Sequence, residues 1–359
     1  MKTKKQLYIA IVIVLLAGMF AGLKIKKLLF QNEEANVSSP KEMVFYTWKD
    51  YTDKSVLKDF QKQFGIKVIL KEYETRDMMI SEIQSEPANF DVIVAPDVVP
   101  ALMQRKLLMK LDLSKIPNCK YIDNKFRNRI FDPQDSYSLP GILWGTTGIV
   151  INTDYVPADI NSWSVFWDKK YKDKIALMDE CRDAMTAVLK YSRFSLNTIA
   201  PNELEIAEQN AKLLRDNDVQ FGETFENLEK VISGKLWISQ AYGGDVIYKA
   251  KNNKNIKYIL PIEGFNICLD NLVISCDSCH KEEAHQFINF LLEPKNAAKA
   301  SKMFSYPSVV NTKEFIDSNF LNDPDIYPTE EVLRHGEFFN DVGDAENMYV
   351  RIFNMLKQK

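Results

Sequence analysis

The alternation of strand-like and helix-like segments is the feature that most limits what this chain can fold into. Met43–Trp48 is apolar and aromatic, as in a buried strand, and Ser55–Phe64 carries apolar residues at helical spacing. Further strands are predicted at Lys67–Tyr73, Asp91–Val94, Gly148–Asn152, Lys174–Met178, Ile256–Leu260 and Asn271–Ser275. Further helices are predicted at Met78–Ile83, Glu203–Arg215 and Ala284–Leu291. Strands alternating with helices at this interval indicate an α/β protein whose mainly parallel sheets are flanked by helices.

Length and charge narrow the class of protein further. The chain has 359 residues, so roughly 320 remain after the first 40, enough for two lobes that each have a core. Charged residues make up 26% of the chain and the net charge is -3, which is not the balance of a polyanion-binding protein. We therefore predict no nucleic-acid partner.

The N-terminal segment has the order of a secretory signal. Three lysines within the first five residues precede the uncharged, apolar run Gln6–Leu23, which predicts export to the periplasm. Lysines follow the run directly, and its length lies between a signal core and a membrane span. Residues 1–40 are thus predicted to be either a removed signal peptide or an uncleaved N-terminal membrane anchor, followed by a polar linker. No Cys lies near the end of the run, which argues against a lipid-anchored protein.

Catalytic motifs are missing from the sequence. There are three His, no Gly-rich phosphate loop, no GxSxG and no His/Glu cluster at metal-ligand spacing, so no enzyme, metal site or cofactor is predicted. The exception is the segment 276–280, Cys-Asp-Ser-Cys-His, which fits the CxxCH pattern of covalent haem attachment. The alternative interpretation is a strand-to-helix loop that happens to carry two cysteines. A c-type haem protein is retained as a remote alternative.

Aromatic and acidic residues gather where a ligand site is expected. In open α/β sheets, ligands bind at the carboxyl ends of the strands. Strand-end positions hold Trp48, Asp50, Tyr51, Glu180 and Asp183. Asp270 is an isolated carboxylate in an apolar stretch, and Tyr242 adds an aromatic residue beside a flexible Gly-Gly turn. Core packing and helix capping are alternative explanations for the five residues at strand ends, Trp48, Asp50, Tyr51, Glu180 and Asp183. Together these residues suit a linear polycation, because carboxylates hold ammonium groups and aromatic faces contact methylene segments and cations.

Seven ordered segments carry a resemblance to a known family. They are FYTWKDYTDKSVLKDFQKQFGIKVI (45–69), FDVIVAP (90–96), YSLPGILWGTTGIVIN (137–152), INSWSVFWDKKYKDKIALMDECRD (160–183), LPIEGFNICLDNLVI (260–274), FINFLLEP (287–294) and GEFFNDVG (336–343). With them the chain resembles the periplasmic spermidine/putrescine-binding proteins of polyamine ABC importers. The resemblance implies a type II-like periplasmic-binding-protein fold, in which two lobes joined by crossing hinge strands close over the ligand. Lobe 1 is predicted at 41–147 and 270–315, and lobe 2 at 148–269 and 316–359.

The resemblance also implies roles for individual residues. Trp48 and Tyr51 form an aromatic wall beside Asp50, Glu180 and Asp183 receive terminal amines, and Asp270 holds the central or distal amine. Tyr242 replaces a family Trp. Three positions depart from the family: Asp97 lies where Ser and Tyr are common, Cys268 replaces a Trp, and Phe339 replaces a Gln.

These departures keep a second ligand open. The implied partners are a polyamine and the permease subunits of an ABC importer in the inner membrane, with the binding protein a monomer. The alternative ligand is another cationic or amine-bearing solute.

Overall fold

A single curled sheet organises the fold. The computed structural model describes residues 41–358, so the predicted leader and linker lie outside the described residues. Its strands are β1 (Glu42–Trp48), β2 (Lys67–Tyr73), β3 (Val92–Ala95), β4 (Ser138–Asn152), β5 (Ile175–Met178), β6 (Gln220–Gly222), β7 (Ile238–Tyr242), β8 (Ile256–Ile259), β9 (Phe265–Ile274) and β10 (Gly336–Glu337). Their order is β2-β1-β3-β9-β4-β7-β5-β6, with β8 paired to β4 and β10 paired to β9.

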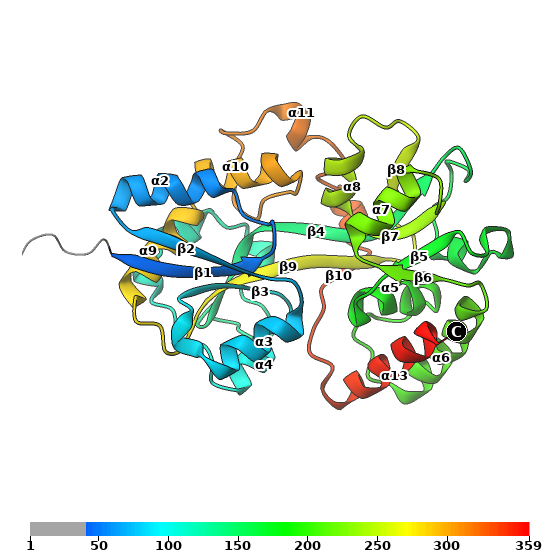
Figure 1. Cartoon of the computed structure of the whole chain (residues 1–359), viewed down its shortest axis with the longest axis horizontal. Helices are drawn as coiled ribbons and strands as arrows, with labels where there is room; N and C mark the ends of the chain where they lie inside the picture. Colours follow the sequence, from blue (N-terminus) through cyan, green and yellow to red (C-terminus); the bar gives the residue numbers. More distant parts are fainter. Residues whose placement is uncertain (1–40, 359) are drawn as a thin grey trace, which may run out of the picture.

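Two long strands connect the two halves of the molecule. β4 and β9 pair with each other in an antiparallel ladder and run across the middle of the molecule (Figure 1). On one side β1 pairs in parallel with β2 and β3, and on the other β5 pairs in parallel with β6 and β7. The predicted α/β class is confirmed. The sheet is parallel among β1–β3 and among β5–β7, and it is antiparallel where β9 joins β3 and where β7 and β8 join β4.

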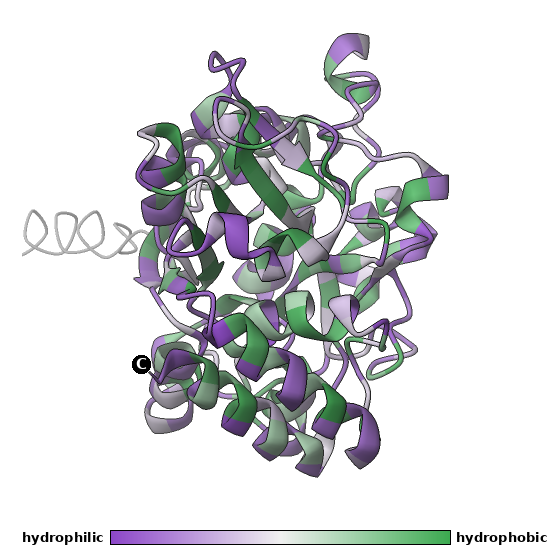
Figure 2. Ribbon diagram, turned by 90° about the vertical axis from the view of Figure 1, so that its right-hand side faces the viewer, coloured by the Kyte–Doolittle hydropathy of each residue, from purple (hydrophilic) through white to green (hydrophobic). Residues whose placement is uncertain are grey.

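Helices cover both faces of each half. Around β1–β3 lie α2 (Lys54–Phe64), α3 (Arg76–Ser85), α4 (Val99–Gln104), α9 (Lys281–Leu291) and α10 (Pro294–Phe304). Around β5–β8 lie α5 (Cys181–Tyr191), α6 (Pro201–Arg215), α7 (Thr224–Ile232), α8 (Gly243–Ala250) and α13 (Glu346–Lys357). The short helices α11 (Ser318–Leu321) and α12 (Glu330–Leu333) follow α10. Figure 2 shows hydrophilic and hydrophobic residues alternating along these helices, as expected for elements with one face on a core.

Each half has a separate core on each face of its sheet. In the first half, α2 and α9 bury residues such as Phe60 and Phe287 on one face, and α3 and α4 bury Met79 and Leu102 on the other. In the second half, α5, α6 and α13 form one core, and α7 and α8 form the other. This layering fits the burial expected of sheets with helices on both faces.

The sequence predicts seven of the ten strands but only four of the twelve α-helices of the described chain. Every predicted strand and helix is present, although β4 and β9 are longer than predicted. The first part of β4 was missed because Pro140, Gly141 and Gly145 resemble turn signals, and the register does shift between Pro140 and Trp144. β7 was missed because its Ser239 and Gln240 are polar although both are fully buried. The lobe limits predicted at 147/148 and 269/270 fall inside β4 and β9 and remain a prediction.

Within residues 41–358, no helix is both long and apolar enough to cross a membrane.

A buried carboxylate organises the turn that leads into β4. Asp132 is 4% exposed and accepts backbone N–H groups from Ser136 at 2.8 Å, Tyr137 at 2.8 Å and Ser138 at 2.9 Å. Replacing Asp132 with a residue that has no carboxylate would leave these three backbone N–H groups in the turn without their acceptor.

We expect Asp132→Ala to lower the free energy of unfolding by about 2–4 kcal/mol, because the backbone donors lose a charged acceptor. Asp168→Ala is the matched control, since exposed Asp168 accepts a single backbone N–H, from Lys170. The control should lose less than about 1 kcal/mol. Chemical denaturation of both variants measures the difference, and equal losses would contradict the role of Asp132.

Candidate functional site

The principal cavity lies where the two halves face each other. It has a volume of about 540 Å³. Its lining includes the residues at the carboxyl ends of β1, β3, β5 and β7 and the central part of β9. The structure brings together in it all nine residues predicted for the site, Trp48, Asp50, Tyr51, Asp97, Glu180, Asp183, Tyr242, Asp270 and Phe339. That they contact a ligand remains a prediction.

Trp48 and Asp270 meet at the crossing strand. The indole Nε1 of Trp48, at the end of β1, donates to the Asp270 carboxylate in β9 at 3.3 Å. Burial raises the pKa of Asp270 to about 6, although the Trp48 hydrogen bond opposes this shift. An acidic group is therefore kept partly desolvated beside a large aromatic face.

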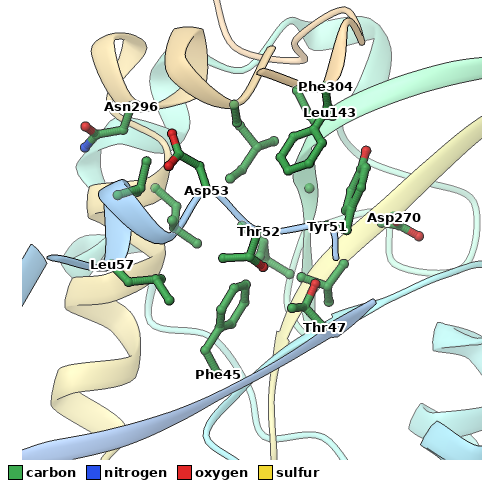
Figure 3. Close-up of a pocket in the computed structure, with 17 residues that line it drawn as sticks. Phe45, Thr47, Tyr51, Thr52, Asp53, Leu57, Leu143, Asp270, Asn296 and Phe304 are labelled. Carbon is green, nitrogen blue, oxygen red and sulfur yellow. The ribbon is translucent and has the colours of Figure 1, made fainter. Parts of the chain in front are cut away.

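Tyr51 separates the cleft from a smaller apolar cavity. This second cavity, about 60 Å³, lies under Phe304 and shares Tyr51, Leu143 and Asp270 with the cleft. Figure 3 shows the Tyr51 ring at the boundary, with the Asp270 carboxylate beyond it. The ring packs against Phe304 at a centroid distance of 5.0 Å. One side of the Tyr51 ring thus packs on the apolar cavity, and the other side faces the cleft.

Glu180 and Asp183 lie at the start of α5, directly after β5. Asp183 is fully buried and accepts from the Tyr242 hydroxyl at 3.1 Å and from Thr147 Oγ1 at 3.4 Å. Burial raises the pKa of Asp183, and the Arg76 guanidinium acts in the opposite direction. Burial also raises the pKa of Glu180, to about 7, against the attraction of Arg76.

Arg76 was missed by the sequence analysis. It begins α3 immediately beyond the end of β2, and its guanidinium lies 3.1 Å from Asp97 and 3.5 Å from Asp183. The predicted residue Asp97 therefore lies in the cleft but is already paired with a cation of the protein. The strand-end rule would have identified Arg76 had it also been applied to the residues after Tyr73.

Tyr306 and Asp245 form a second group that sequence reasoning did not assign to the site. The Tyr306 hydroxyl donates to Asp245 at 2.8 Å, and burial raises the pKa of Asp245 to about 6. The Tyr306 ring fits between Gly145 and Gly244, where an added Cβ would lie 2.7 and 2.2 Å from ring atoms. Asp245 could have been found only if β7, which precedes α8, had been recognised. We find no sequence signal for Tyr306.

The three departures from the family pattern are also accounted for in the structure. Asp97 pairs with Arg76, and the Cys268 sulfur lies 3.2 Å from Thr147 Oγ1. The buried Phe339 ring packs under the guanidinium of Arg182, 4.7 Å from its centroid. Cys268 and Phe339 both line the cleft, so they contribute surface rather than charge to it.

Negative charge dominates the cleft. Its lining contains nine carboxylates and three basic side chains. Lys49 pairs with Glu74, Arg76 pairs with Asp97 and Asp183, and Lys357 from outside the lining pairs with Asp179. Within the described chain, no basic side chain forms an ion pair with Glu180, Asp245 or Asp270. Half-buried carboxylates without a basic partner favour a cationic ligand, because their charge is partly removed from water.

The CxxCH segment lies away from the cleft, in the loop between β9 and α9. The His280 ring nitrogen Nδ1 is 3.1 Å from buried Asp91, and the Ser278 hydroxyl donates to the same carboxylate at 2.6 Å. Cys276 and Cys279 are free thiols. These contacts explain the segment as a strand-to-helix connection. Among residues 41–358, no three His, Cys, Asp or Glu side chains are placed to hold a metal ion.

Two α/β halves, joined by crossing strands around an acidic and aromatic cleft, define the class of two-lobed solute-binding proteins. The family described as bacterial extracellular solute-binding protein matches residues 55–328, and the chain belongs to this family. It is a family of binding proteins and not of enzymes, and the resemblance found in the sequence is confirmed.

Named relatives extend over nearly the whole chain. The spermidine/putrescine-binding periplasmic proteins of Salmonella typhimurium and Escherichia coli are each 30% identical over 327 residues, covering 90% of this chain and 93% of theirs. The structure of the spermidine/putrescine ABC transporter substrate-binding protein PotD from Streptococcus pneumoniae is similar with a TM-score of 0.78 at 27% identity. That match covers 89% of this chain and all of the other, and it confirms the predicted two-lobed fold.

The raised pKa values predict an unusual pH dependence of stability without ligand. The folded state holds protons on Asp245 and Asp270 up to about pH 6, above the usual range of an unfolded Asp. Ionisation of these two carboxyl groups therefore lowers the free energy of unfolding as the pH rises from about 4 to 6, and acidification raises it again.

We expect Asp245→Asn/Asp270→Asn to be more stable than the wild type at pH 7.5, by on the order of 1 kcal/mol per carboxylate, and to lose this advantage near pH 4.5. Urea denaturation without ligand at both pH values measures it. Asp159→Asn, at an exposed position, is the control and should show no such pH-dependent difference. If the double variant differed from the wild type in stability by the same amount at both pH values, the raised pKa values of Asp245 and Asp270 would be contradicted.

Proposed function

We propose that the protein is the substrate-binding component of an ABC importer that takes up a polyamine. The observation that carries this proposal is a set of half-buried carboxylates without a basic partner in the described chain, Glu180, Asp245 and Asp270, in a cleft rich in aromatic residues. Relatives named for spermidine and putrescine support the same ligand class.

The physical chemistry of a polyamine matches this lining. Moving an ammonium group out of water is unfavourable unless a carboxylate or several acceptors replace its hydration. Asp270 supplies such a carboxylate beside Trp48, and Glu180 supplies another near Asp183. Trp48, Tyr51, Tyr242 and Phe339 cover the methylene segments and provide faces for cation–π contact. Asp50, exposed at the rim, adds to the negative field that attracts the ligand.

Transport requires the bound and free states to differ. In the proposed cycle, the ligand neutralises carboxylates of both halves, which favours closure about the crossing strands β4 and β9. The closed form then presents the outer surfaces of both lobes to the permease subunits in the inner membrane. We propose that the protein acts as a monomer on the periplasmic side, with residues 1–40 serving as its signal or its tether.

One observation favours the second candidate, another amine-bearing solute. Arg76 contacts two of the acidic side chains of the cleft, and its single positive charge offsets one of their two negative charges, so less negative charge remains than the sequence indicates. A ligand with fewer amines would also satisfy the site.

Titration calorimetry with putrescine, cadaverine, spermidine and spermine tests the proposal. We expect saturable binding of at least one of these amines by the purified domain. Absence of binding to all four, in protein shown by circular dichroism to be folded, would contradict a polyamine function. A small amine found by mass spectrometry in an extract of the natively purified protein would then identify the second candidate.

A single substitution tests the acidic half of the site. Asp270→Asn should weaken polyamine binding by about 2–5 kcal/mol, because the ligand loses the charge of a desolvated pair. The matched control is Asp179→Asn, since Asp179 also lines the cleft but pairs with Lys357 at its rim. It should cost less than about 1 kcal/mol. Unchanged affinity in Asp270→Asn would remove Asp270 from the site.

A further inference from the structure

Arg76 is a positive charge placed inside a cleft that otherwise selects cations. Its side chain is 17% exposed and lines the cleft. Nη1 lies 3.1 Å from one oxygen of Asp97 and donates to the other at 3.3 Å, and Nη2 donates to Asp183 at 3.5 Å. Arg76 and Asp97 come from the half that contains β1–β3, whereas Asp183 belongs to α5 in the other half. The guanidinium therefore bridges carboxylates across the cleft, as an ammonium group of a ligand would.

This arrangement occupies three of the four carboxylate oxygens that a ligand would need at that end, and the fourth, the buried Oδ1 of Asp97, lies 3.1 Å from Nη1 of Arg76 without accepting a hydrogen bond. Asp183 Oδ2 accepts from Arg76 and Tyr242, and its Oδ1 accepts from Thr147. Both oxygens of Asp97 face Arg76. An ammonium group brought to these carboxylates would lie beside the guanidinium, and two like charges in a partly desolvated site repel each other strongly.

We propose that Arg76 takes the place of one ammonium group of the ligand and so restricts the cleft to diamines, excluding longer polyamines at this end. The proposal rests on the polyamine function proposed above and names the class of amine. Asp245 and Asp270 remain for the two ammonium groups of a diamine, since neither has a basic partner in residues 41–358. Glu180 also has no basic partner there, but it lies at the Arg76 end of the cleft, where the guanidinium attracts its carboxylate and repels a further ammonium group. Tyr306, which donates to Asp245, packs edge-on against the Tyr51 ring at a centroid distance of 6.0 Å, and Tyr51, Asp245 and Asp270 line the same cavity.

The negative charge of the cleft argues against the opposite role, in which Arg76 would bind a carboxylate of the ligand. Nine carboxylates line the cleft, and the guanidinium already contacts two of them. A ligand carboxylate would therefore enter a field of its own sign. The other arginine of the lining, Arg129, has a different environment, since its guanidinium stacks on Phe338 at 3.7 Å from the ring centroid.

Calorimetry on the wild type gives the first test. Putrescine or cadaverine should bind at least about tenfold more tightly than spermidine. Tighter binding of spermidine or spermine than of both diamines would overturn the proposal while leaving the polyamine function intact. Tighter binding of an ω-amino acid such as 4-aminobutyrate would also overturn it, whereas absence of binding by any polyamine would contradict the polyamine function itself.

Substitutions then isolate the charge. Arg76→Met keeps an unbranched side chain without the cation, and it should raise the affinity for spermidine at least about tenfold relative to putrescine. Arg76→Lys keeps the cation and should keep the preference for diamines, as should the control Arg105→Met, which removes an exposed arginine outside the cleft lining. An unchanged spermidine-to-putrescine ratio in folded Arg76→Met, or loss of binding to both amines, would overturn the proposal. If that variant does not fold, the wild-type ranking still decides.

Discussion

The antiparallel ladder between β4 and β9 is the constraint on which the rest of the structure depends. It is the connection through which the sheets of the two halves become one, and it places the carboxyl ends of β1 and β3 opposite those of β5 and β7. Asp270 lies in β9 at the register shift of this ladder, between the paired residues Leu269 and Asn271, so a carboxylate that lines the cleft also belongs to the strand that joins the halves. Any movement of one half against the other must be accommodated along these strands, which couples the ligand site to the hinge.

The second constraint is the cost of holding negative charge away from water. Glu180, Asp245 and Asp270 have raised pKa values because the cleft buries them, and no lysine or arginine in the described chain compensates them directly. A site of this kind lowers the stability of the empty protein, and binding of a cation restores that stability. Asp97 and Asp183 are compensated internally by Arg76. The cleft thus contains two kinds of carboxylate: Asp97 and Asp183 share the single positive charge of Arg76, whereas the other three have no basic partner in residues 41–358 and are available for a ligand.

Much of this could be predicted because it depends on local patterns. The strands β1, β2, β3 and β5 follow from short apolar runs, and the helices α2 and α9 follow from apolar residues at helical spacing. Aromatic and acidic residues directly after those strands identified Trp48, Tyr51, Glu180 and Asp183 as cleft residues. β7 escaped detection because its buried Ser239 and Gln240 are polar, and Gln240 is stable there because it hydrogen-bonds Met178 and Asp183.

By itself, the sequence determined the α/β class, the family and the acidic, aromatic character of the site, because these depend on residue types and spacing along the chain. The tertiary structure decided which charges remain free. Arg76 and Asp183 are 107 positions apart, and Tyr306 and Asp245 are 61 apart. Ion pairing and burial depend on distance in space and on exclusion of water, and neither can be read from sequence separation. Only the fold therefore shows that the Arg76 guanidinium contacts two carboxylates of the cleft.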